Sequence, residues 1–333
     1  MPRRSPEPYR VRPFLDLASY GRRGPGHDSR LSPAQIEHIE RTVRRTPEVM
    51  LKISGGGQSA KAVAAHFNYL TRQDFEIETD DGEHLKGRGP EYTLIEDWEL
   101  DLDAAESRKS YRGAPGRSPT KLVHNIVLSM PAGTPAQGVL KASRNFAREQ
   151  FALKHRYALV LHTDQPHPHV HLVVKAMSEQ GKRINIRKET LREWRREFAR
   201  HLRAQGIAAN ATMRAVRGAT KTHKSDGVFR AMSAGRSTHM RGRVDSAGAA
   251  LLGGNTQIEP GKARLVNTRR DVIQGWLGLS ACLRVNGRDG LAHEVQRFLK
   301  GMSPPRTELE SISHSLMQFG RKNSARTREP PTR

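Results

Sequence analysis

The sequence contains one cysteine and no long apolar run. A lone Cys282 excludes an internal disulfide framework and a zinc site built from thiolates. No stretch of 18 apolar residues is present, and the start, MPRRSPEPYRVRPF, lacks the apolar segment of a secretory signal. We therefore expect a cytoplasmic protein with no membrane insertion.

Apolar residues are scarce as well, at 35% of the 333 residues, with aromatic residues at 5%. This apolar share is below that of a typical globular chain. A chain of this length can still bury a sizeable core. We expect one packed domain with solvated or disordered appendages.

Acidic residues are outnumbered by basic ones. Lys and Arg number 57 against 34 Asp and Glu, which gives a net charge of +23. Such a charge predicts attraction to a polyanion and is silent about the fold. Residues 76–106 hold twelve acids and two bases, so the rest of the chain carries +33. We interpret this acidic segment as a solvated excursion away from the polyanion site; a surface that competes with nucleic acid is the alternative.

Periodicity and breaker residues predict an α+β fold. Ser32 as N-cap and Pro33 at the first position open a helix to about residue 45. The six-residue connection between the last two predicted strands requires them to be antiparallel. The expected architecture is a two-layer sandwich with a central antiparallel sheet and helices on one face. The further elements are strands at 49–54, 122–130, 157–162 and 169–176, and helices at about 59–72, 134–154 and 188–205.

Composition shifts give the domain boundaries. The main domain should span 32–218, with the acidic excursion inside it. The flanking segments are rich in Arg, Gly, Ser and Pro or form short helical patterns. They are a disordered basic arm at 1–31, a basic linker at 219–262, a small helical segment at 263–320 and a disordered basic tail at 321–333.

The stretch HTDQPHPHVH, residues 162–171, concentrates four histidines. Alternate residues of a strand share a face, so His169 and His171 point together, and His162 ends the neighbouring strand beside them. Three imidazoles leave coordination positions open, as a catalytic metal site does. Asp164 can hold one of the imidazoles by accepting its second N–H. His167, between two prolines, is better explained as a loop residue.

This stretch resembles the third motif of the conjugative relaxases, mobilisation nucleases of the HUH endonuclease superfamily that include the T-DNA border-nicking type. That motif runs His-x-Asp and then, after four residues, His-hydrophobic-His, which His162, Asp164, His169 and His171 match. The resemblance covers about 48–218. It implies a divalent metal, Mg²⁺ or Mn²⁺, on the three histidines and a DNA nickase that acts at a transfer origin.

The resemblance also implies a tyrosine nucleophile in the helix after the first strand, where HFNYLTRQ offers Tyr69. Helical phase supports this choice, because Val63, Phe67 and Leu70 form the buried stripe and Tyr69 falls outside it. The phenol would attack a DNA phosphate and give a 5′-phosphotyrosine. Asp164 would orient the site or act as base, and His66 is another candidate base or nucleophile.

Candidate DNA contacts flank these residues. NIVLSMPAGTP resembles the middle relaxase motif, in which a hydroxyl residue lies beside the nick, and Ser129 matches it. The glycines at 55–57 do not match the pattern of a phosphate-binding P-loop. They either let a DNA phosphate approach the backbone or form a tight turn. The basic candidates for phosphate contacts are Arg72, Lys175, Arg183, Arg214 and Arg217.

The sequence therefore predicts a site- and strand-specific nickase for conjugative mobilisation. Its expected partners are hairpin and single-stranded DNA at a transfer origin, relaxosome accessory proteins and a type IV secretion coupling protein. Three alternatives stay open: a rolling-circle replication initiator, a histidine-triad nucleotide hydrolase, and a non-catalytic basic DNA-binding accessory protein. HPHVHLVV fits the histidine-triad pattern except at Pro168, but that pattern leaves His162 and Asp164 unexplained.

Overall fold

The computed structural model describes residues 31–72, 75–87, 89–111, 120–219, 226–253 and 259–326. They form two compact units. Arg45–Ala211 make one, and the chain up to Arg44 combines with the chain from Thr212 onward to make the other. The predicted basic arm and tail lie outside the described residues, apart from Leu31 and the end of the last helix.

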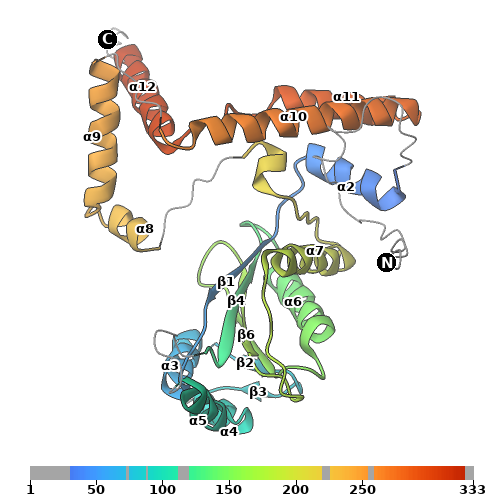
Figure 1. Cartoon of the computed structure of the whole chain (residues 1–333), viewed down its shortest axis with the longest axis vertical. Helices are drawn as coiled ribbons and strands as arrows, with labels where there is room; N and C mark the ends of the chain where they lie inside the picture. The colour runs from blue at the N-terminus through green and yellow to red at the C-terminus, as the bar shows by residue number, and fades with distance from the viewer. Residues whose placement is uncertain are drawn as a thin grey trace, which may run out of the picture. The chain divides into compact units, whose positions relative to one another are not determined.

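A six-stranded sheet forms the centre of the Arg45–Ala211 unit (Figure 1). Every pair of neighbouring strands in it is antiparallel. The predicted α+β class with a central antiparallel sheet is confirmed. In the order β1-β4-β6-β5-β2-β3, the strands are β1 (Met50–Gly55), β4 (Val123–Ser129), β6 (His169–Lys175), β5 (Tyr157–His162), β2 (Ile77–Thr79) and β3 (His84–Leu85).

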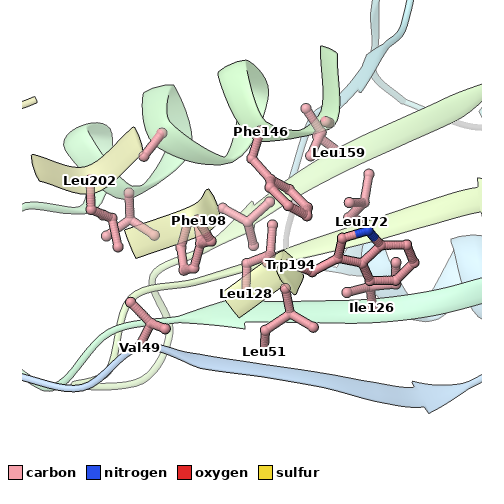
Figure 2. Close-up of a cluster of buried hydrophobic side chains, with 14 of the residues drawn as sticks. Val49, Leu51, Ile126, Leu128, Phe146, Leu159, Leu172, Trp194, Phe198 and Leu202 are labelled. Carbon is pink, nitrogen blue, oxygen red and sulfur yellow. The ribbon is translucent and has the colours of Figure 1, made fainter. Parts of the chain in front are cut away.

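Two long helices cover one face of this sheet: α6 (Ala136–Phe151) and α7 (Lys188–Ala204). Their amphipathic stripes pack on the alternate strand residues that point the same way. Figure 2 shows Phe146, Trp194 and Phe198 among the strand residues of this layer. These aromatic side chains and Leu51, Leu128 and Leu172 of the sheet are all buried. The sheet and this helix layer form the two layers that the sequence predicted. The expectation of helices on one face only is not met, because helices pack on the other face as well.

A second apolar layer lies on the other face. It is formed by α3 (Ala60–Leu70), α4 (Pro90–Asp97) and α5 (Leu100–Tyr111), which pack on Val123, Ala158, Val160 and Val173 of the sheet. This face is covered only in part, because the alternating residues at the opposite end of β5 and β6 are histidines. On this face, apolar helix residues therefore cover one end of the sheet, and the histidines lie at the other end.

The acidic segment 76–106 differs from our expectation of a solvated excursion. It supplies β2, β3, α4 and the start of α5, and its Trp98 is fully buried against Phe67. Its apolar residues recur at helical spacing and point inward, which the many acids obscured. Several of the acids pair with one cation: Arg156 forms ion pairs with Asp80 at 2.8 Å and with Asp97 at 2.7 Å.

The other unit is helical. It contains α2 (Pro33–Val43), the 3₁₀ turn η2 (Arg214–Arg217), α8 (Asp226–Ser233), α9 (Thr238–Leu252), α10 (Lys262–Val285), α11 (Asp289–Lys300) and α12 (Glu308–Arg326). Ser32 caps α2 in a capping box with Gln35. Within the part of the chain that the structure describes, no helix is both long and apolar enough to cross a bilayer.

Two of the predicted boundaries differ from this organisation. We expected α2 to open the main domain, but its Ile39 is buried against Val272 and Trp276 of α10. The Arg44 guanidinium also pairs with Glu294 of α11 at 2.9 Å. The predicted linker at 219–262 contains α8 and α9, whose helical pattern its Gly, Ser and Arg content concealed.

Replacing Trp98 with Ala should destabilise the Arg45–Ala211 unit by about 3–5 kcal/mol, because a fully buried indole leaves a cavity. The free energy of unfolding is measured by urea denaturation. Leu102→Ala on α5 is the control, since Leu102 is 62% exposed and should change stability by less than about 0.5 kcal/mol. Equal, small effects would mean that the acidic segment is not part of the cooperative fold.

Candidate active site

Strand pairing brings His162, His169 and His171 together. His162 lies opposite His169, and Val160 lies opposite His171, so the three histidines share one face of the β5–β6 pair. One ring nitrogen from each can be chosen so that all three lie within 4.8 Å of one another. The ring centroids are 4.6–5.2 Å apart. This is a three-imidazole group that can hold one divalent ion.

Hydrogen bonds fix the proton on two of these rings. His162 Nε2 donates to the Leu70 carbonyl at 2.8 Å, and His169 Nδ1 donates to the His167 carbonyl at 3.0 Å. A carbonyl only accepts, so each of these nitrogens must carry the hydrogen. The second nitrogen of each ring is then left with a lone pair, as metal ligation requires.

Burial keeps two of the three histidines neutral. Burial, followed by the neighbouring His162, His169 and His66 and the cation of Arg72, lowers the pKa of His171 to about 3. Burial is also the main cause of the lowered pKa of His162. Neutral imidazole is the ligating form, so no proton has to leave His162 or His171 when a metal binds near neutral pH.

The end of α3 lies directly beside the histidines. Ser59 caps this helix, and Val63, Phe67 and Leu70 are its buried residues, as helical phase predicted. Tyr69 is 50% exposed. Because the Leu70 carbonyl accepts the hydrogen bond from His162, the residue after Tyr69 is tied to the histidine group. Tyr69 therefore stands at the edge of the site with its side chain accessible.

His66 is a ring neighbour of both Tyr69 and the histidine group. Its ring centroid is 6.4 Å from that of Tyr69 and 6.4 Å from that of His171. Burial lowers the pKa of His66, and the nearby His162 lowers it further. A neutral imidazole at this position can accept a proton. Its Nε2 is buried and makes no hydrogen bond to the residues that the structure describes.

Asp164 does not contact an imidazole as expected. Its carboxylate accepts a hydrogen bond from the Arg72 guanidinium at 3.3 Å. Arg72 in turn lies over the Tyr69 ring, with its Cζ 4.1 Å from the ring centroid. The loop after β5 and the end of α3 are therefore joined through Arg72. Sequence patterns could not reveal this contact, because residues 72 and 164 belong to separate elements.

Phe75 is a site residue that the sequence analysis did not name. Its ring stacks on His162 with a centroid separation of 4.4 Å and an interplanar angle of 21°. The stack holds the imidazole plane on the side of β2. The only sequence signal was an isolated aromatic residue just before the acidic segment.

The remaining residues that the sequence predicted as DNA contacts lie on several different elements. Ser129 lies opposite His169 in the sheet but is buried, and its hydroxyl donates to the Met130 carbonyl at 3.4 Å. Lys175 lies at the far end of β6, six residues or about 20 Å from His169. Arg183 donates to the Lys121 carbonyl before β4, at that same end. Arg214 and Arg217 belong to the helical unit. Of the three basic candidates in the Arg45–Ala211 unit, Arg72 is the one at the histidines.

The glycine run between β1 and α3 is explained by packing. A Cβ on Gly56 would lie 2.3 Å from the Val123 carbonyl oxygen, and a Cβ on Gly57 would lie 2.4 Å from a methyl group of Val63. Neither position has room for a side chain. The two glycines therefore allow the turn to lie close against β4 and α3, whatever else approaches it.

Comparison with known proteins supports a nuclease domain. Residues 88–207 match the family described as relaxase, MobA/VirD2-like, nuclease domain. The chain is 34% identical over 107 residues to the T-DNA border endonuclease VirD2 of Rhizobium radiobacter and 33% identical over 111 residues to that of Agrobacterium fabrum. These matches cover 29% and 30% of this chain and 25% of each relative. The chain thus spans about a quarter of the length of the curated relatives it matches.

A solved structure titled "Molecular Basis of Vancomycin Resistance Transfer in Staphylococcus aureus" also matches, at 14% identity. The match covers 50% of this chain and 99% of that chain, with a TM-score of 0.30, which is too low to support an argument. The resemblance to relaxases is confirmed by the family match and the VirD2 relatives. The matched span includes the three histidines, Asp164 and Ser129, and it begins after Tyr69 and Arg72.

The three-histidine group should bind about one divalent ion per chain. Loss of a residue that only supports a metal ligand lowers metal affinity about 10- to 100-fold. Replacing His162, His169 or His171 with Ala removes a ligand itself, so metal affinity should fall by more than this. His167→Ala is the matched control, because its ring is on the exposed connection outside the group. Calorimetric titration with Mn²⁺ measures the affinity, and metal loss in His167→Ala but not in His162→Ala would refute the assignment.

Proposed function

We propose that this chain, with its match to the relaxase nuclease domain, is a metal-dependent DNA nickase that acts through Tyr69. It would cleave one strand at a specific site and remain attached to the 5′ end. The observation that carries the proposal is the placement of an exposed tyrosine at the end of α3, directly beside three histidines that share one face of β5 and β6.

A divalent ion held by His162, His169 and His171, Mg²⁺ or Mn²⁺, would draw charge from the non-bridging oxygens of the scissile phosphate. The Tyr69 oxygen attacks phosphorus, and the bond to the 3′ oxygen breaks, which leaves a free 3′ hydroxyl. One phosphodiester replaces another, so the reaction can run backwards and rejoin the strand. This reversibility suits a protein that recircularises a transferred strand.

His66 is the better-placed base for the phenolic proton. Its ring stacks beside that of Tyr69, it is neutral, and its Nε2 is without a partner among the described residues. Asp164, which we first assigned as an orienting residue or base, already pairs with Arg72. A base has to be within reach of the proton that it removes, and this geometry favours His66.

The expected substrate is DNA with a hairpin and an adjacent single strand, at the transfer origin of a mobile element in a bacterial cytoplasm. The charge of +33 outside the acidic segment suits a polyanion. The helical unit, which adds basic residues, would strengthen DNA binding or dock on relaxosome accessory proteins and a secretion coupling protein. A rolling-circle replication initiator would share this chemistry and differ only in its target site.

A histidine-triad hydrolase fits the geometry less well. Its pattern uses the histidines of one strand, whereas here His162 from the neighbouring strand completes the group. An accessory protein without activity would have no need of an exposed Tyr69 beside that group.

Tyr69→Phe should abolish adduct formation, because it removes the attacking oxygen and keeps the ring. Protein is incubated with a labelled nic-site oligonucleotide and Mn²⁺, and retained label is read after denaturing electrophoresis. Cleavage should fall by at least about 10³-fold, the scale expected when a nucleophile is lost. Tyr92→Phe, at an exposed position of α4, is the matched control. An adduct that persists in Tyr69→Phe and disappears in His66→Ala would instead make His66 the nucleophile.

DNA affinity should fall steeply with salt. If about 5 to 8 phosphates are neutralised, the plot of log affinity against log salt has a slope of roughly −4 to −7. Fluorescence anisotropy with a double-stranded oligonucleotide between 50 and 200 mM salt gives this slope. A flat plot would count against DNA as the partner.

A further inference from the structure

We propose that Arg72 is a positioning residue for the nucleophile, and that Asp164 acts on Tyr69 through Arg72 rather than on a metal ligand. This inference rests on the proposed function and assigns a new task to two residues of the same site. It replaces the first interpretation of Arg72 as a phosphate contact and of Asp164 as the partner of an imidazole.

The contact with the ring is direct. The Arg72 Cζ lies 4.1 Å from the centroid of Tyr69, well inside the range in which a cation is attracted to an aromatic face. Arg72 can reach the ring because α3 ends at Leu70 and Thr71 is its C-cap, so the chain turns away after Tyr69. The guanidinium covers one face of the ring and leaves half of the side chain open to solvent.

Asp164 determines where the guanidinium lies. Its carboxylate holds an Arg72 nitrogen at 3.3 Å from the connection that follows β5. The Asp164 side chain is the more enclosed of the two, 18% exposed against 37% for Arg72. A pair of this exposure adds little to stability. Its effect is geometric, because it ties a neighbour of the nucleophile to the loop that connects the two strands bearing the histidines.

Two tethers therefore lie beside Tyr69. Both lie just after Tyr69 in the chain: the Leu70 carbonyl accepts a hydrogen bond from His162, and the Arg72 side chain is held by Asp164. Both tethers lead to residues at the end of β5 or just after it. The two contacts thereby fix the position of the Tyr69 backbone relative to the histidine group, while the Tyr69 side chain stays exposed. The cation also favours the reaction, since negative charge builds on the ring as its proton leaves.

The test compares cleavage with binding. Arg72→Gln should lower the single-turnover rate of adduct formation about 3- to 30-fold. The Kd for DNA should stay within about twofold, and the salt slope should be unchanged. Lys61→Gln is the matched control, since it removes one positive charge from an exposed position of α3, the helix that precedes Arg72. A phosphate contact would instead weaken binding and reduce the steepness of the salt slope by about 0.9, and that result overturns the proposal.

Arg72→Lys keeps a positive charge that can lie over the ring. It should recover part of the lost rate at an unchanged Kd. If the rate recovers only together with tighter DNA binding, Arg72 acts on the substrate and the proposal fails.

A double-mutant cycle tests the role of Asp164. Asp164→Asn should slow adduct formation in the wild-type background, leave Mn²⁺ affinity unchanged, and have no further effect in Arg72→Gln. Effects that multiply, or a loss of Mn²⁺ affinity in Asp164→Asn, would show that Asp164 acts on the histidines instead. A wild-type protein that forms no adduct overturns the proposed function itself, whereas a normal wild type with unaffected variants overturns only this inference.

Discussion

The pairing of β5 with β6 is the constraint on which the candidate site depends. Their register places His162 opposite His169 and brings His171 to the same face, two residues further along β6. A slip of one residue would put Val170 on that face and send the imidazoles into the apolar layer under α6 and α7. That layer buries Val170 and Leu172 completely, so the slip would expose apolar side chains and bury polar ones. The apolar core on one face of the sheet thus fixes how the three imidazoles are arranged on the other face.

The same strands carry two environments along their length. Toward one end, Ala158, Val160 and Val173 are covered by α3, α4 and α5. Toward the other end the cover stops, and histidines replace the aliphatic side chains. Because the boundary falls at the end of α3, Tyr69 and the Leu70 carbonyl face the site, while the side chains of Val63, Phe67 and Leu70 are packed in the core. Burial at this boundary lowers the pKa of His162 and of His171, so both rings are held in the neutral form that can ligate a metal.

The site was more predictable than its surroundings. Strand alternation placed His169 and His171 together, and helical phase separated Tyr69 from the stripe of Val63, Phe67 and Leu70, because both patterns are local. Contacts between distant elements leave no such pattern. The pairing of Asp164 with Arg72 and the stacking of Phe75 on His162 could therefore be seen only in three dimensions. The acidic segment was misread because its charge outweighed the few apolar residues, such as Trp98, that fold it onto the sheet.

The position of α2 has a consequence for how the chain is made. This helix is synthesised before the Arg45–Ala211 unit, yet Ile39 is buried by Val272 and Trp276, which follow more than two hundred residues later. The unit between them is continuous, and its two ends meet where the Val49 amide donates to the Asn210 carbonyl at 2.9 Å and the Asn210 amide to the Pro47 carbonyl at 2.8 Å. Since domains generally fold as units and in order during synthesis, the Arg45–Ala211 unit can close while α2 still lacks its partners. Translation would thus complete this unit before the helical unit can assemble around α2.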